Sequence, residues 1–114
     1  MGRYLLTGAA GYVGREVIRQ LIEAGEDVLA VDLRDPGIAG ITYYPVDITD
    51  LAALKRTFEN VEIDYILHVA SLPGDTGNPR QMVDINVCGC TDMLELARIK
   101  QVKRIVVVSS ISAY

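Results

Sequence analysis

Short apolar runs alternate with amphipathic segments along the whole chain, and this alternation restricts the folds that it can adopt. The apolar runs consist mostly of Val, Ile, Leu and Ala, the mixture expected of strands that are buried on both faces. In the segments between them, apolar residues recur at helical spacing. The pattern predicts strands at residues 3–7, 27–32, 41–46, 65–71 and 104–110, and helices at 12–25, 50–61 and from 78–79 to about 100. Strands that alternate with helices predict an α/β fold, a doubly wound parallel sheet with helices on both faces.

Single residues mark several ends of these elements. Gly25 closes the first amphipathic segment, at a position where helices favour glycine. Thr49 or Asp50 can cap the second helix with its side-chain oxygen. Pro45 has no N–H to donate to a neighbouring strand, so the third strand is expected at an edge of the sheet.

Composition and charge exclude several classes of partner. The chain has 114 residues, which is one domain or part of one, and a net charge of -4 without a basic run, so nucleic acid is not expected to bind. No apolar run approaches the roughly 18 residues of a membrane span, and the first residues do not resemble a signal peptide. A cytoplasmic location without a membrane partner is therefore expected.

The two cysteines, Cys88 and Cys90, fall two residues apart in a helical pattern. Residues at this spacing do not face each other on a helix, so a disulfide between them is not expected. They also lack the C-x-x-C spacing of a zinc or redox site. We interpret them as two small thiols that line the core, and no metal site is expected.

The stretch TGAAGYVG, residues 7–14, places three glycines between the first strand and the first helix. Glycine inside an element costs about 0.5–1 kcal/mol relative to alanine, so this clustering needs a reason. Gly8 would let the backbone leave the strand in a conformation closed to side chains, and Gly11 would let a diphosphate approach the amino end of the helix. Gly14 would let the helix pack closely on the sheet. A loose, flexible turn is the simpler alternative.

Asp32 supports the diphosphate interpretation. It ends the second strand, 24 residues beyond Gly8, where a carboxylate can accept hydrogen bonds from both hydroxyls of an adenosine ribose. The same charge would repel a 2′-phosphate, which favours NAD over NADP, although Arg34 lies close by. No Lys-Ser or Lys-Thr pair follows Gly14, which excludes a kinase-type phosphate loop. Residues 1–114 are thus predicted to form a Rossmann-type dinucleotide-binding domain; otherwise Asp32 would be a solvated loop acid.

Five stretches together resemble the extended short-chain dehydrogenase/reductase family, the NAD-dependent epimerases and dehydratases of nucleotide sugars. They are TGAAGYVG (7–14), VDITD (46–50), LHVAS (67–71), INVCGCTDMLELAR (85–98) and VKRIVVVSSISAY (102–114). The likeness covers essentially the whole chain. The sequence departs from the family pattern at Ser71, where Ala or Gly is usual, at Cys90, a usual Thr, and at Asp92, a usual Asn.

The resemblance implies which residues bind the cofactor, NAD. Asp47 would contact the adenine amine and Ile48 the ring edge, unless Asp47 only helps to cap the next helix. The backbone of His68, rather than its ring, would line the site; taken alone, this residue would be an ordinary core histidine. Asn86 would hold the loop after the fourth strand by hydrogen bonds, or would be an ordinary polar residue of a helix. The full expected set is Gly8, Gly11, Tyr12, Val13, Gly14, Asp32, Leu33, Arg34, Asp47, Ile48, His68, Val69, Ala70, Ser71, Asn86 and Ser109.

The resemblance also implies hydride transfer between the nicotinamide and a substrate, a nucleotide sugar or a similar alcohol. Ser110 matches the serine that donates a hydrogen bond to the reacting oxygen; otherwise Ser109 and Ser110 are plain strand-end serines. The Tyr-x-x-x-Lys pair that moves the proton lies further along the chain in the family, and this sequence ends at Tyr114. We therefore expect the N-terminal, cofactor-binding part of a longer enzyme, inactive by itself and without its substrate domain. A homodimer is one possible assembly.

Two other functions stay open. Because the Tyr-x-x-x-Lys pair is missing, the chain could be a non-enzymatic dinucleotide-binding module that senses redox state or scaffolds a partner. A related fold could also bind a different nucleotide, such as S-adenosylmethionine. Titration with NAD, NADP and S-adenosylmethionine distinguishes a NAD site from the last of these.

Overall fold

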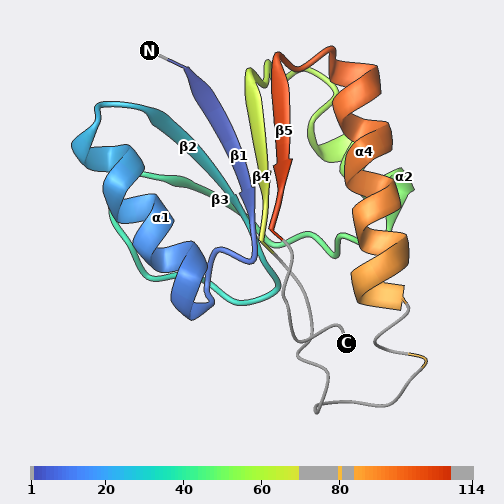
Figure 1. Cartoon of the computed structure of the whole chain (residues 1–114), viewed down its shortest axis with the longest axis horizontal. Helices are drawn as coiled ribbons and strands as arrows, with labels where there is room; N and C mark the ends of the chain where they lie inside the picture. Colours follow the sequence, from blue (N-terminus) through green and yellow to red (C-terminus); the bar gives the residue numbers. More distant parts are fainter. Residues whose placement is uncertain (1, 70–79, 81–83, 109–114) are drawn as a thin grey trace.

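Five parallel strands form one sheet in the computed structural model, which describes residues 2–69, 80 and 84–108. The strands are β1 (Arg3–Thr7), β2 (Asp27–Val31), β3 (Thr42–Tyr44), β4 (Tyr65–His68) and β5 (Arg104–Val107). Their order in the sheet is β3-β2-β1-β4-β5, and every neighbouring pair is parallel (Figure 1). The predicted parallel sheet is confirmed, with β1 at its centre.

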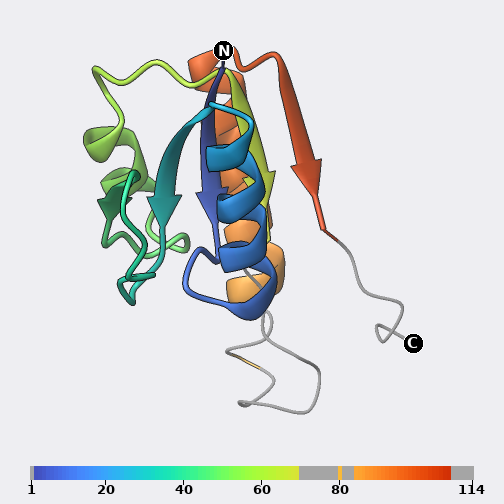
Figure 2. The ribbon, with the colours of Figure 1, turned by 90° about the vertical axis from the view of Figure 1, so that its left-hand side faces the viewer.

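Helices cover both faces of this sheet, as the sequence predicts. α1 (Tyr12–Glu23) lies on one face, whereas α2 (Leu51–Thr57) and α4 (Gly89–Lys100) lie on the other (Figures 1 and 2). Successive side chains of a strand therefore enter different cores. Leu5 belongs to the core beneath α2 and α4, whereas Leu6 packs in the core with Ile18 of α1. Both leucines are fully buried, which explains why the strand is an unbroken apolar run.

The element ends fall near the residues that predict them. The Asp50 carboxylate accepts a hydrogen bond from the Ala53 N–H at 3.0 Å and caps α2. β3 is an edge strand, as predicted, but it stops at Tyr44, directly before Pro45, and not at residue 46, because proline has no N–H to donate to the ladder. The second helix ends at Thr57 rather than at residue 61, and the Lys100 ammonium donates to the Phe58 carbonyl at 2.7 Å. The Phe58 carbonyl also accepts the Val61 N–H at 3.1 Å, so the chain leaves the helix in a tighter turn and a cation from α4 binds the same carbonyl.

The third predicted helix contains a wide turn that the apolar pattern does not indicate. Residues Asp84–Cys88 form a π-helical segment, η1, directly before α4, while the predicted start at residues 78–79 lies outside the described residues. The interpretation of the two cysteines as core thiols is wrong for Cys88, which is exposed, and Cys90 is only partly buried. Gly89 and Met93 face the core instead. A π turn holds one residue more than an α turn, and this shifts the phase of the helix around it.

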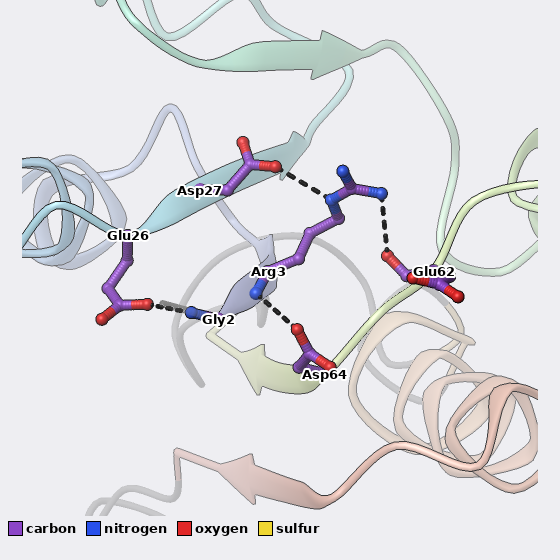
Figure 3. Close-up of polar contacts among 6 residues, drawn as sticks. All are labelled: Gly2, Arg3, Glu26, Asp27, Glu62 and Asp64. Carbon is purple, nitrogen blue, oxygen red and sulfur yellow. Dashed lines mark hydrogen bonds and ion pairs between the residues drawn. The ribbon is translucent and has the colours of Figure 1, made fainter.

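Charged contacts around Arg3 join the amino ends of three strands (Figure 3). Its guanidinium Nε donates to Asp27 Oδ2 at 2.9 Å, and its backbone N–H donates to Asp64 Oδ2 at 2.8 Å. The Gly2 N–H donates to the Glu26 carboxylate nearby. Exposed ion pairs contribute only about 0–1 kcal/mol each, so these contacts support the register of β1 with its neighbours more than the overall stability.

The side chains of Val106 and Val107 are exposed on β5, the edge strand opposite β3.

No helix in the described part of the chain is long and apolar enough to cross a membrane.

Candidate functional site

A cleft of about 600 Å³ opens at the carboxyl ends of β1, β2 and β4. This volume lies within the roughly 300–1,000 Å³ of typical small-molecule sites. Open α/β sheets bind ligands at this edge, at the point where the strand order reverses. Here the chain passes from β3 at one edge to β4 on the far side of β1, which places the reversal beside β1. The cleft is lined by Gly8, Gly11, Tyr12, Val13, Val31, Asp32, Leu33, Arg34, Val46, Asp47, Ile48, Val69 and Ile85.

The sequence predicts every residue of this lining except Val31, Val46 and Ile85. Val31 and Val46 directly precede the predicted acids Asp32 and Asp47. The place where each apolar run ends could therefore have identified these two valines as lining residues. Ile85 lies in the π turn, which no pattern in the sequence indicates.

The other predicted site residues lie outside the lining. Gly14 and His68 are buried next to it, and Asn86 lies in η1, partly buried. Four predicted residues are outside the described residues: Ala70, Ser71, Ser109 and Ser110.

The glycine turn, residues 8–11, leaves β1 and forms one wall of the cleft. Gly8 has a φ of +69°, which residues with side chains rarely adopt, and its carbonyl accepts a hydrogen bond from the Gly11 N–H at 3.1 Å. Among the residues that the structure describes, a Cβ on Gly11 would have only the Gly8 carbonyl oxygen as a near neighbour, at 3.4 Å. The missing side chain at Gly11 therefore leaves the cleft open and does not relieve a clash within the protein.

Gly14 is required for a different reason. A Cβ at this position would lie 2.0 Å from the Gly8 carbonyl oxygen and 2.9 Å from the carbonyl carbon. Both are backbone atoms, so no side-chain rotation can make room. Gly14 allows α1 a close approach, as the sequence predicts, but its near partner is the backbone of the glycine turn rather than the strands of the sheet.

The amino end of α1 begins at the cleft. Gly11 is its N-cap residue and makes no side-chain cap, and Tyr12 and Val13 of the first turn line the cleft. By contrast, α2 has the Asp50 carboxylate at the same position. The first N–H groups of a helix lack partners within it and carry the positive end of the helix dipole. An end without a side-chain cap is therefore suited to an anion.

Asp32 faces the cleft from the end of β2 and contacts two segments. Its Oδ2 accepts a hydrogen bond from the Ala10 N–H of the glycine turn at 3.0 Å. Its Oδ1 accepts one from the Arg34 N–H, also at 3.0 Å. The carboxylate thus connects the turn after β1 with the turn after β2, in addition to lining the cleft.

Asp47 lines the cleft and also shapes the approach to α2. Its Oδ1 accepts hydrogen bonds from the Thr49 N–H at 2.9 Å and from the Thr49 hydroxyl at 2.7 Å. Asp50, and not Asp47, caps the helix. Asp92 of α4 lies near both acids: partial burial, then the charges of Asp50 and Asp47, raise its pKa. Within the described residues, no group of three or more His, Cys, Asp or Glu could hold a metal ion.

The His68 ring is buried behind the cleft, with 3% of its surface exposed. Its Nδ1 lies 2.8 Å from the hydroxyl oxygen of Thr7, and that oxygen accepts a hydrogen bond from the Val69 N–H at 3.0 Å. The ring is absent from the lining, whereas Val69 is part of it. His68 is thus linked to the cleft-lining residue Val69 through the Thr7 hydroxyl, and burial lowers the pKa of its ring.

We expect acid to destabilise the fold through His68, the single histidine of the chain. Burial lowers its folded-state pKa, while an imidazole in an unfolded chain has a pKa of about 6.5. The stabilisation from the neutral ring is thus complete above about pH 6.5 and is lost as the pH falls toward the folded-state pKa. Urea unfolding at about pH 7.5 and about pH 5.5 measures this loss, which should shrink in His68→Gln. An equal loss in both proteins would contradict the assignment.

A family model for the NAD dependent epimerase/dehydratase family matches residues 4–114. Among curated proteins, the chain is 36% identical to UDP-glucuronate 4-epimerase of Thermodesulfobacterium geofontis, over 100% of this chain and 41% of that protein. It is 34% identical to UDP-glucose 4-epimerase of Streptomyces lividans, over 99% of this chain and 37% of that protein. The chain thus spans well under half the length of these relatives.

Solved structures give the same fold. A short-chain dehydrogenase/reductase superfamily protein of Agrobacterium tumefaciens with bound NAD matches 95% of this chain and 32% of its own, with a TM-score of 0.82 and 31% identity. UDP-glucose 4-epimerase of Thermotoga maritima, solved with UDP-glucose, matches 95% of this chain and 38% of its own, with a TM-score of 0.84 and 27% identity.

Proposed function

Because the chain belongs to the NAD-dependent epimerase/dehydratase family, we propose that its cleft binds NAD and that it forms the cofactor-binding part of a cytoplasmic oxidoreductase. NAD is the cofactor of this family. The observation that carries the proposal is the bare backbone at the start of α1, where Gly8 and Gly11 line the cleft and the N-cap residue, Gly11, makes no side-chain cap.

The residues around the cleft fit the parts of a dinucleotide. The uncapped end of α1 suits the diphosphate, because an anion there meets N–H groups and the positive end of the helix dipole. Gly11 leaves room for it, since one carbonyl oxygen is the single near neighbour of its Cβ position within the described part of the chain. Asp32 suits the adenosine ribose, and its charge disfavours a 2′-phosphate. Asp47 and Ile48 would then hold the adenine.

The remaining predicted residues belong to the nicotinamide half in this proposal. Val69 lines the cleft at the end of β4, and Ala70 and Ser71 follow it in the sequence. His68 supports this segment from behind through the Thr7 hydroxyl, which accepts the Val69 N–H. We assign Asn86 and Ser109 to the same half by the family resemblance alone.

The chemistry follows from the cofactor and from one side chain. When bound, the nicotinamide would accept a hydride from the substrate and return it. Ser110 would donate its O–H to the reacting oxygen of the substrate and so hold that oxygen in place. This role for Ser110 rests on the family resemblance.

We expect Ser110→Ala to lower turnover by about 10²–10³-fold, the usual cost of removing one such donor. The measurement requires a form of the protein that carries a Tyr-x-x-x-Lys pair for proton transfer. The affinity for NAD should stay unchanged, because the serine contacts the substrate and not the cofactor. Full turnover in the variant would remove Ser110 from the mechanism.

A nucleotide sugar is the proposed substrate, and a homodimer the proposed assembly. The two curated relatives described above are named as epimerases of UDP-glucuronate and UDP-glucose, which supports the substrate class. Exposed apolar side chains on η1 and α4 support the assembly: Val87, Leu94 and Ile99. Turnover of UDP-glucose or UDP-glucuronate by a form of the protein that carries a Tyr-x-x-x-Lys pair tests the substrate, and analytical sedimentation tests the homodimer.

Calorimetric titration of the 114-residue chain tests the cofactor proposal. NAD should bind, NADP should bind more weakly because Asp32 repels its additional phosphate, and S-adenosylmethionine should not bind. Equal binding of NAD and NADP would remove Asp32 as the selecting group. Binding of S-adenosylmethionine alone would overturn the proposed function.

A further inference from the structure

We propose that Asp32 also positions the glycine turn for the diphosphate before any ligand arrives, a second role that rests on the proposed function. Asp32 Oδ2 accepts the Ala10 N–H at 3.0 Å, and Ala10 is in the middle of the turn between Gly8 and Gly11. The other oxygen, Oδ1, accepts the Arg34 N–H at 3.0 Å and so holds the carboxylate itself in place. Asp32 is thus a positioning residue for the turn as well as a lining residue of the cleft.

The turn needs a contact of this kind because its own residues restrain it little. Glycine loses more backbone freedom on ordering than any other residue. The Gly11 N–H bonds to the Gly8 carbonyl, but this contact lies within the turn itself. The Ala9 N–H reaches the Val31 carbonyl at 3.5 Å, a long hydrogen bond. The charged, short contact from Asp32 to Ala10 is therefore the stronger link between the turn and β2.

Because Asp32 is charged, an experiment can distinguish its positioning role from a contact with ribose. A carboxylate beside a diphosphate site repels the diphosphate. If Asp32 acted only through the ribose hydroxyls, its neutralisation would strengthen the binding of a diphosphate ligand that lacks them. If Asp32 also positions the turn, its neutralisation weakens the binding of that same ligand. The two roles predict changes of opposite sign.

ADP and 2′,3′-dideoxy-ADP are the probes, and Asp32→Asn is the variant. We expect Asp32→Asn to weaken ADP binding by about 30-fold and dideoxy-ADP binding by about 5-fold, the range of one or two lost charge-assisted hydrogen bonds. Asp35→Asn is the matched control: it removes the same charge three residues away, where the Asp35 carboxylate accepts the Gly37 N–H within its own turn. It should change neither affinity by more than about twofold. Unchanged or tighter binding of dideoxy-ADP by Asp32→Asn would overturn the positioning role.

Amide hydrogen exchange in the ligand-free protein supplies a readout that does not depend on ligand binding. The Ala10 amide should be protected in the wild-type protein and in Asp35→Asn, and should exchange faster in Asp32→Asn, where a single uncharged amide oxygen replaces the two carboxylate oxygens that accept the Ala10 and Arg34 N–H groups. A wild-type Ala10 amide that exchanges as fast as a free loop would overturn the positioning role even if Asp32→Asn fails to fold. If the wild-type chain binds neither nucleotide while Ala10 is protected, the proposed function fails and the hydrogen bond itself stands.

Discussion

Replacing Gly14 with alanine is expected to remove at least about 3 kcal/mol of folding free energy, the upper part of the range for overpacked sites. The added carbon would lie 2.0 Å from the Gly8 carbonyl oxygen, so α1 must move away from the glycine turn or the turn must deform. Domains of this size are stable by only about 5–15 kcal/mol, so the loss is a large share of the total. Thermal and urea unfolding followed by circular dichroism measure it.

Gly11→Ala is the control for this result, because it adds the same methyl group three residues earlier. Its Cβ would lie 3.4 Å from the nearest atom, and Gly11 has an extended backbone with φ -78° and ψ 172°, open to any residue. The expected cost is about 1 kcal/mol or less, the range for alanine at an N-cap. A Gly14→Ala protein as stable as Gly11→Ala would contradict the packing described for α1.

The same Gly11→Ala variant is expected to lose NAD affinity by about 100-fold, which corresponds to about 2.7 kcal/mol. Its methyl group would be added to a residue that lines the cleft, where the diphosphate is proposed to meet the first N–H groups of α1. Because the fold is retained, the loss would reflect the site and not the stability. Calorimetry with NAD, on protein shown to be folded by circular dichroism, measures it.

A second substitution controls for general changes at the mouth of the cleft. Tyr12 is 94% exposed and follows Gly11 directly, so Tyr12→Ala removes a side chain without adding an atom near the backbone. We expect a much smaller change in affinity, within about tenfold, because the N–H groups stay accessible. If Gly11→Ala binds NAD as tightly as the wild type, the diphosphate does not lie against this turn.

Much of the fold could be predicted because its local signals agree. Leu5 and Leu6 enter different cores, so a strand buried on both faces needs an unbroken apolar run, and the sequence has one. Asp50 caps α2 with its side-chain acceptor, and Pro45 lacks an N–H to donate to a neighbouring strand. Both effects are local and can be recognised without a structure. The family resemblance is confirmed by a family model that covers residues 4–114.

The candidate site could be predicted where a residue that lines the cleft also has a special place in the backbone. Gly8 with its positive φ, Gly11 at the N-cap and Asp32 after β2 are rare choices in their local context, and all three line the cleft. The hydrogen bond from Ala10 to Asp32 could not be predicted, because it joins two turns whose distance depends on the packing of β1 against β2.

The π turn is the main feature that the sequence did not indicate. Periodicity assumes a constant helical repeat, and an additional residue in one turn leaves the average pattern of a long segment almost unchanged. Both Ile85, which lines the cleft, and Cys88, which is exposed, lie in this turn, and a regular helical pattern gave no reason to expect either position. Such a turn depends on the packing around it, which the sequence pattern does not describe.

Backbone amide chemical shifts, followed while NAD is added to the folded chain, test the central proposal most directly. We expect the largest changes at Gly11, Tyr12 and Val13, where the uncapped end of α1 would meet the diphosphate, and almost none at Arg3 and Asp64 at the opposite end of the sheet. No change at any amide with NAD in large excess, or changes confined to the Arg3 end, would contradict a dinucleotide site at the glycine turn.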